Sequence, residues 1–109
     1  MATEYKLLGQ VAPSPNTVTN VYQTGASTSA IVGTITLLNP TDSNTSYSLI
    51  VRPINQSLAI QHHIIRGGII PPRELVTITG AVTMNSNVVL ACNTHVTGVS
   101  LQAFGAEII

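Results

Sequence analysis

The sequence predicts an all-β domain, an antiparallel β-sandwich (jelly-roll or immunoglobulin-like) of about eight short strands. Short apolar runs alternate with clusters of Gly, Pro, Asn, Asp and Ser along all 109 residues, which is typical of strands separated by turns. Apolar residues nowhere recur at the three- and four-residue spacing that a helix of ordinary length needs. Aromatic residues make up only 4% of the chain, so branched aliphatic side chains must fill the core, and these favour strands.

The expected strands are separated by connections rich in turn-forming residues. They span residues 4–8, 17–23, 30–39, 47–52, 60–66, 75–79, 88–92 and 99–104. Short strands at this spacing favour a sandwich or a small barrel. A second core would need roughly 50 residues of its own, so the strands are expected to form one core.

Residues 30–39 show the clearest strand pattern. Ile31, Ile35 and Leu37 fall on one side of such a strand and the other side is partly polar, so the first side is expected to face the core. The next residues, Pro-Thr-Asp-Ser-Asn, favour a tight turn. Residues 31–51 are therefore predicted to form a hairpin.

Residues 1–16 are predicted to form an extended N-terminal segment, and residues 17–109 the sandwich domain. Pro13 and Pro15 favour extended backbone, so this segment is expected to reach over a neighbouring subunit like an arm, about ten extended residues spanning roughly 30 Å. Later in the chain, Pro71–Pro72 is expected to carry the backbone from one sheet to the other.

Charged residues are scarce, at 7% of the chain, and the four basic residues balance the four acidic ones. A soluble domain ordinarily has about a quarter of its residues charged. Nucleic acid is not expected as a partner, because no basic stripe is present to neutralise phosphates. The sequence also shows no signal-peptide pattern and no apolar run of the roughly 20 residues that a membrane span requires. We expect a protein made in the cytoplasm, with no membrane partner.

No pattern in the sequence indicates catalysis. The lone Cys92 lies in an apolar strand and is interpreted as a core residue. No nucleophile elbow, phosphate-binding loop or dinucleotide fingerprint is present. The acidic residues, at strand ends or in loops, are expected not to pair as the acids of a hydrolase do; they are Glu4, Asp42, Glu74 and Glu107. We therefore expect no enzyme, no cofactor and no small-molecule substrate.

The histidines are expected to make ordinary hydrogen bonds. His62 and His63 are adjacent, so in a strand they would project to opposite sides and could not ligate one ion within a subunit. A ring of His62, His63 or His95 around a symmetry axis would be needed to bind a cation. No metal site is predicted.

Several segments together resemble a family of small all-β virion structural proteins of tailed bacteriophages, common in phages of cyanobacteria and other marine bacteria. The resembling stretches are Tyr-Lys-Leu-Leu-Gly-Gln-Val-Ala-Pro at 5–13, Val-Tyr-Gln at 21–23 with Ala-Ser-Thr-Ser-Ala-Ile-Val at 26–32, Leu-Ile-Val-Arg-Pro at 49–53, and Phe-Gly-Ala-Glu-Ile at 104–108. Proteins of this kind are described as decoration, cement or tail-fibre-associated proteins.

The resemblance implies a capsid decoration or cement protein on the outer capsid surface. Its partners would be the major capsid protein and further copies of itself, most simply as a homotrimer. The alternative that it implies is a tail, collar or fibre-associated protein that contacts host glycans through Asn, Thr and Tyr side chains. A small hydrolase or a lectin-like accessory protein is a third, weaker reading of the residues.

Contacts with other subunits are expected from the N-terminal segment and from the few charged or histidine side chains near the predicted sheet crossing. The candidate contact residues are Tyr5, Lys6, Pro13, Pro15, His62, His63, Arg66 and Arg73.

Overall fold

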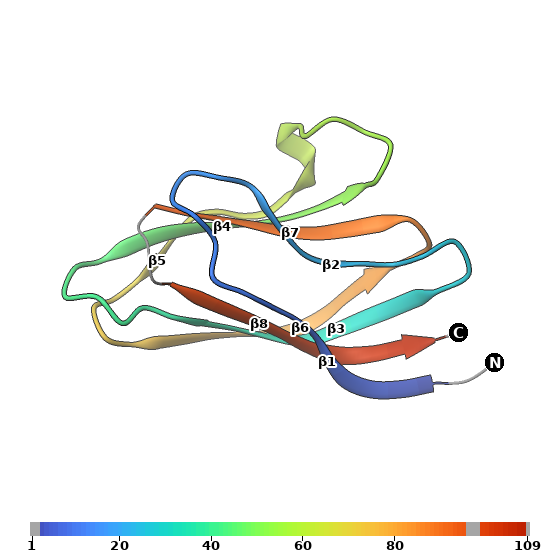
Figure 1. Cartoon of the computed structure of the whole chain (residues 1–109), viewed down its shortest axis with the longest axis horizontal. Helices are drawn as coiled ribbons and strands as arrows, with labels where there is room; N and C mark the ends of the chain where they lie inside the picture. The colour runs from blue at the N-terminus through green and yellow to red at the C-terminus, as the bar shows by residue number, and fades with distance from the viewer. Residues whose placement is uncertain (1–2, 96–98, 109) are drawn as a thin grey trace.

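The computed structural model describes residues 3–95 and 99–108, which form two antiparallel sheets packed face to face (Figure 1). The strands are β1 (Thr3–Val11), β2 (Thr19–Gln23), β3 (Ser29–Leu38), β4 (Thr45–Pro53), β5 (His63–Ile70), β6 (Leu75–Met84), β7 (Val88–Thr94) and β8 (Ser100–Ile108), with a 3₁₀ turn, η1 (Ile60–His62), before β5. Sheet A has the order β1-β8-β3-β6, and sheet B the order β2-β7-β4-β5. The predicted all-β sandwich is confirmed.

Aliphatic side chains from both sheets fill the space between the two layers. Ile35, Leu37 and Leu101 of sheet A and Leu49 and Leu90 of sheet B are all buried in one cluster. This agrees with the low aromatic content, because branched aliphatic side chains pack well on the pleated faces of strands. Cys92 belongs to the same cluster, which confirms its interpretation as a core residue.

A β-bulge in β3 corrects the alternation expected for this strand. Ile35 and Leu37 are buried as predicted, but Ile31 is 39% exposed and its neighbours Ala30 and Val32 are buried instead. The register of β3 shifts between Val32 and Thr34 against both β6 and β8. An extra residue at a bulge reverses which residues face the core. Even-numbered residues of β3 are therefore buried before the bulge, and odd-numbered residues after it.

The hairpin predicted for residues 31–51 is wrong, because β3 lies in sheet A and β4 in sheet B. The chain crosses between the sheets at Asn39, whose side chain is fully buried. Its Nδ2 donates hydrogen bonds to the carbonyl oxygens of Ser43 (2.8 Å), Ile70 (3.1 Å) and Pro71 (3.1 Å). The hydrogen bonds of Asn39 therefore connect the crossing between β3 and β4 to the crossing between β5 and β6. The residues between β3 and β4 form a connection between the sheets instead of the tight turn of a hairpin.

The second crossing is the one predicted at Pro71–Pro72. It connects β5 of sheet B with β6 of sheet A, so the prediction is confirmed. Arg73 follows the two prolines with a positive φ of 56°, and its backbone N–H donates to the carbonyl oxygen of Thr41 (3.1 Å). The two crossings are thus bonded to each other at the same end of the sandwich.

The N-terminal residues are part of the sandwich, which corrects the expected arm. β1 pairs with β8 from Thr3 to Val11, so the side of its backbone that faces β8 has ladder partners in the chain itself. Leu8 and Val11 pack against the core, and Pro13 in the connection to β2 is buried. The connecting residues after β1 turn back over the sandwich edge to β2 (Figure 1).

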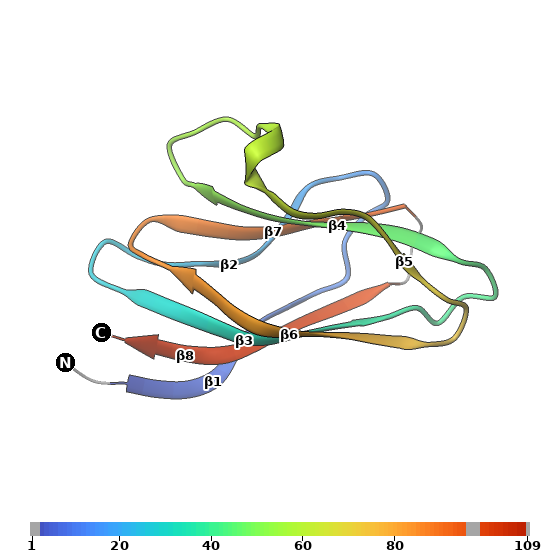
Figure 2. The ribbon, with the colours of Figure 1, turned by 180° about the vertical axis from the view of Figure 1, so that it is seen from behind.

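The segment that follows β4 covers the outer side of sheet B. The sequence predicted a strand over residues 60–66, but Ile60–His62 form η1 and β5 begins only at His63. Figure 2 shows this segment standing above β4. Ile50, Val89 and Ala91 form a small second cluster of buried residues, distinct from the core between the sheets.

Candidate functional site

The candidate contact residues do not form one site. Tyr5 and Lys6 lie on β1, an edge strand of sheet A, whereas His63 and Arg66 lie on β5, an edge strand of sheet B. Pro15 is exposed in the connection between β1 and β2. Two of the eight residues, Pro13 and His62, are buried, which leaves them little surface to offer to another subunit.

Arg73 already has a partner within the chain. Its Nε donates to Oδ1 of Asp42 at 2.7 Å, and the two side chains are 72% and 79% exposed. An exposed ion pair of this kind contributes only about 0–1 kcal/mol. Arg66, by contrast, is exposed and makes no ion pair within the described part of the chain.

His62 is held by hydrogen bonds inside η1 and the loop before it. Its Nδ1 accepts from the backbone N–H of Ala59 at 2.9 Å, and its Nε2 lies 3.2 Å from Oε1 of Gln56. An imidazole that accepts at Nδ1 carries its hydrogen on Nε2 when neutral, so Nε2 donates to Gln56. The sequence predicted that His62 and His63 lie in one strand and project to opposite sides of it. This is corrected, because His62 lies in the 3₁₀ turn η1 and β5 begins at His63.

The other two histidines have different surroundings from His62. His63 is half-buried, and its Nδ1 has no hydrogen-bond partner. His95 is exposed, with its Nδ1 3.3 Å from Oδ1 of Asn16. Among the described residues, no three His, Cys, Asp or Glu side chains gather closely enough to hold a metal ion.

A polar cluster that sequence reasoning missed lies at one edge of the sandwich. Glu4 and Glu107, which were expected at strand ends or in loops, are directly opposite each other on β1 and β8. Lys6 Nζ lies 2.5 Å from Glu107 and 3.7 Å from Glu4. Tyr22 of β2 donates its hydroxyl hydrogen to Glu107. These four residues, here called the edge cluster, link sheet A to sheet B.

The charges of the edge cluster explain the pKa shifts of its members. Hydrogen bonds from Lys6 and then Tyr22 hold the pKa of Glu107 below its usual value. The hydrogen bond to Glu107 raises the pKa of Lys6. Burial, and then the hydrogen bond to the Glu107 carboxylate, raise the pKa of Tyr22. Near neutral pH the cluster is thus an ionised carboxylate held by two donors, which suits a structural link better than proton transfer.

The outward side of sheet A carries exposed apolar residues next to the edge cluster. Tyr5 is 86% exposed, Ile31 39% and Phe104 38%, and Leu7 lies opposite Phe104 on the neighbouring strand. We call these four residues the outer apolar patch. Beside it, Gly33 and Gly105 help to leave a shallow hollow of about 300 Å³. Exposed apolar patches of this kind often mark interaction surfaces.

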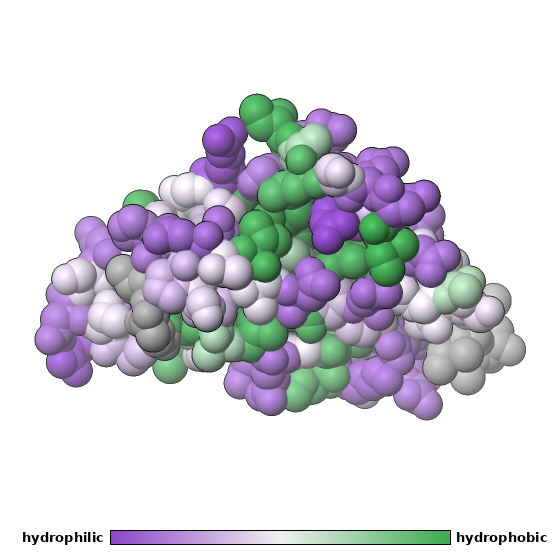
Figure 3. All heavy atoms as spheres, turned by 45° about the horizontal axis from the view of Figure 1, so that its top comes forward, coloured by the Kyte–Doolittle hydropathy of each residue, from purple (hydrophilic) through white to green (hydrophobic). Residues whose placement is uncertain are grey.

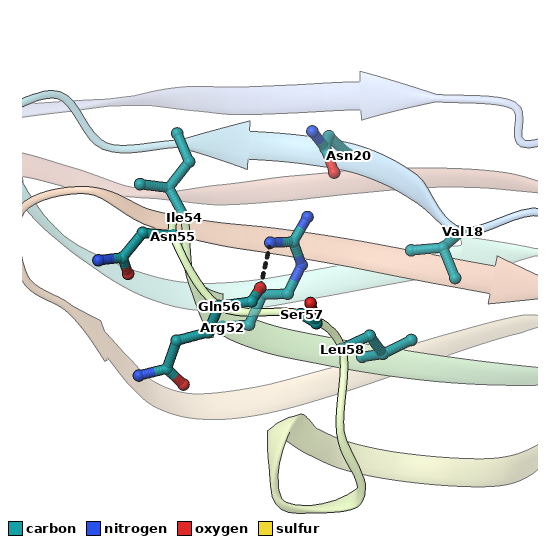
Figure 4. A pocket seen from close by; sticks show the side chains of 8 residues that line it. All are labelled: Val18, Asn20, Arg52, Ile54, Asn55, Gln56, Ser57 and Leu58. Atoms are coloured by element: carbon teal, nitrogen blue, oxygen red, sulfur yellow. Dashed lines mark hydrogen bonds between the residues drawn. The ribbon is translucent and has the colours of Figure 1, made fainter.

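A larger recess of about 610 Å³ lies on the outer side of sheet B (Figure 4). Its lining consists of Val18, Asn20, Arg52, Ile54, Asn55, Gln56, Ser57 and Leu58. Figure 3, which brings this side forward, shows hydrophobic side chains lying among hydrophilic ones. Arg52 Nη1 donates to the carbonyl oxygen of Gln56 at 3.0 Å and forms no ion pair with a described residue.

The recess, here called the amide recess, offers hydrogen-bonding amides, one guanidinium and aliphatic side chains to a ligand. Such a lining suits a polar molecule that carries hydroxyl or carboxylate groups. Sequence reasoning treated residues 53–59 as a connection. The signal that could have identified them is the pair Ile54 and Leu58, because apolar residues in a polar loop commonly pack against a sheet face.

Among the residues that the structure describes, there is no helix long and apolar enough to cross a membrane. Neither the models of known protein families nor the curated protein sequences give a match to this chain.

Proposed function

We propose that this protein is a structural subunit of a tailed-phage particle, and that it decorates the capsid and stabilises contacts between major capsid protein subunits. The observation that carries the proposal is the outer apolar patch on a sandwich with few charged residues. Tyr5, Ile31 and Phe104 are exposed on one face, while only 7% of the chain is charged. The resemblance of the sequence to phage virion proteins is what suggests a tailed-phage particle.

Physical chemistry supports docking by such a face. Burying apolar area stabilises a complex by roughly 25 cal/mol per Å² before the costs of association are counted. A low charge density lowers the cost of removing water from the surface. When many copies sit on a symmetric lattice and each touches more than one capsid subunit, weak contacts combine into strong attachment through effective concentration.

The proposal is tested with empty shells assembled from the major capsid protein of the phage that encodes this chain. Purified protein is added to the shells, and binding and the melting temperature of the shell are measured. Phe104→Ser, in the outer apolar patch, should weaken binding about tenfold or more. Ile69→Ser, which changes an exposed aliphatic residue on β5, is the matched control and should bind normally.

Two results would contradict the decoration function. One is that the unaltered protein neither binds the shells nor raises their melting temperature. The other is that Phe104→Ser and Ile69→Ser weaken binding equally, since this would remove the role of the outer apolar patch.

A second candidate function is that of a tail, collar or fibre-associated protein that contacts host glycans. The amide recess favours it, because Asn20, Asn55 and Gln56 line it together with Arg52, whose guanidinium forms no ion pair with a described residue. A glycan array distinguishes this function: we expect binding of acidic glycans that Arg52→Gln abolishes. A blank array, together with binding to capsid shells, would exclude it in favour of decoration.

A further inference from the structure

The first half of β1 is a free sheet edge. β1 lies at the end of sheet A, and among the described residues its one strand partner is β8; Figure 2 shows it as the outermost strand of its sheet. β2 packs on the face of the second half of β1, where a Cβ added to Gly9 would lie 2.2 Å from the carbonyl oxygen of Val21. From Thr3 to Leu7 the pairing with β8 is regular, and the register shifts only beyond Leu7.

The five residues of this free edge are self-complementary. Tyr5 is central, Glu4 and Lys6 flank it, and Thr3 and Leu7 form the ends. If two copies of the strand pair antiparallel with Tyr5 opposite Tyr5, each Glu4 lies opposite the Lys6 of the other copy. Directly opposite residues on antiparallel strands share a face and interact. We propose that two copies of this chain join through Thr3–Leu7 in this register and form one continuous eight-stranded sheet.

Charge selects this register over its neighbours. A shift that keeps the two faces of the sheet matched must move the pairing by two residues. One such shift places Glu4 opposite Glu4 of the other copy, and the other places Lys6 opposite Lys6. Like charges directly opposite each other destabilise a strand pair. The register centred on Tyr5 is the one in which each charge meets its opposite.

The contacts within the edge cluster leave Glu4 available for a second ion pair. Within one chain, Lys6 is shared between two carboxylates, at 2.5 Å from Glu107 and 3.7 Å from Glu4. Glu4 is thus the weakly held member, and its side chain is 58% exposed. In the two-fold pair, the Lys6 of the second copy reaches Glu4 from the other side. The two edge clusters then lie side by side across the interface, and positive and negative side chains alternate along them.

The pairing also extends the outer apolar patch. Tyr5, Ala106 and Ile31 are opposite one another on β1, β8 and β3, so Tyr5 stands on the outward face. Tyr5 of one copy opposite Tyr5 of the other makes an aromatic cross-strand pair. It joins two outer apolar patches into one surface and removes the unpaired backbone edge that would otherwise invite aggregation. This inference is independent of a virion role.

Sedimentation equilibrium over concentrations up to the millimolar range measures the assembly. We expect a particle of twice the mass of the chain, in place of the trimer expected from the sequence. Glu4→Lys keeps the Lys6–Glu107 contact and places a new ammonium group opposite Lys6 of the other copy, so it should raise the dimer Kd at least about tenfold. The effect should shrink in high salt.

Charge swaps provide the matched controls. An equimolar mixture of the Glu4→Lys and Lys6→Glu variants should form a heterodimer that neither variant forms alone, and the double variant E4K/K6E should regain the dimer. Circular dichroism checks that each variant is folded. Hydrogen exchange should show that the amides of Thr3–Leu7 become protected as the concentration rises.

Three results would overturn the pairing. These are a monomer at every concentration, a particle of three times the chain mass, and a dimer that is unaffected by Glu4→Lys. If Lys6→Glu does not fold, Glu4→Lys and the exchange of the Thr3–Leu7 amides still decide the question.

Discussion

The hydroxyl of Tyr22 on β2 donates a hydrogen bond to the carboxylate of Glu107 on β8, a residue 85 positions later in the chain. The two strands belong to different sheets. Lys6 of β1 approaches the same carboxylate, so a polar link closes the side of the sandwich where β1 and β2 meet. The side chain of Glu107 is only 14% exposed, which makes its two donors important.

Replacing Glu107 with Gln should lower the free energy of unfolding by about 1–2 kcal/mol, because a charge-assisted acceptor is lost from two donors. Chemical denaturation at neutral pH measures the loss. Glu74→Gln changes an exposed carboxylate that has no ion pair among the described residues, and it should have almost no effect. Equal stability of the two variants would contradict the role of Glu107.

The lowered pKa of Glu107 also predicts a pH dependence. A carboxyl group whose pKa is lower in the folded state than in the unfolded state stabilises the protein above its unfolded pKa of about 4.5. This contribution is lost as the pH falls through the folded-state pKa. Acidification below about pH 4 should therefore destabilise the unaltered protein more than Glu107→Gln, and denaturation curves at several pH values should show the difference between them shrinking.

Two glycines near the bulge should respond oppositely to an added methyl group. A Cβ at Gly105 would lie 2.1 Å from the carbonyl oxygen of Ile31, whereas a Cβ at Gly33 would meet no atom closer than 4.0 Å. Gly105→Ala must push β8 away from β3 and should cost about 2 kcal/mol or more. Gly33→Ala should change stability by less than about 1 kcal/mol. Thermal melting compares them, and similar melting temperatures would contradict the described register.

The strand pattern could be predicted from the sequence, but the sheet partners could not. Alternation places Ile35 and Leu37 in the core because period-two burial is a local property of the chain. The bulge at Gly33 reverses that alternation for Ile31, and its cause lies in contacts with two other strands. The hairpin prediction failed for the same reason, since a turn-rich segment does not encode whether the chain returns to its own sheet.

The candidate site was harder to predict than the fold. The Pro71–Pro72 crossing could be anticipated because proline limits the local backbone. The edge cluster could not, since Glu4, Tyr22 and Glu107 meet only when β1 and β8 pair and sheet B packs on them. The amide recess likewise forms only once residues 54–58 fold over sheet B near Val18 and Asn20.

Replacing Ile35 with Asp should unfold the protein, because its side chain is buried in the core and a carboxylate there has no partner. Thr77→Asp, at an exposed position of the neighbouring strand β6, is the control and should remain folded. Circular dichroism and gel filtration distinguish the outcomes. A native-like Ile35→Asp variant would show that the core register of β3 is mistaken.

Deleting residues 1–15 should destabilise the sandwich, in contrast to the behaviour expected of a free arm. The deletion removes β1, the packing of Leu8 and Val11 on the core, and Lys6 from Glu107. A loss of at least about 2 kcal/mol follows from the two aliphatic side chains alone. Thermal melting measures it. An unchanged melting temperature would mean that β1 does not stabilise the sandwich, and it would support a free N-terminal arm instead.

The copy number and position of this chain in purified phage particles test the decoration function most directly. Quantitative mass spectrometry with an image of the particle at low resolution supplies both. Decoration predicts on the order of hundreds of copies spread over the shell, as symmetric capsid lattices provide. About a dozen copies or fewer confined to the tail, or none in the particle, would contradict it.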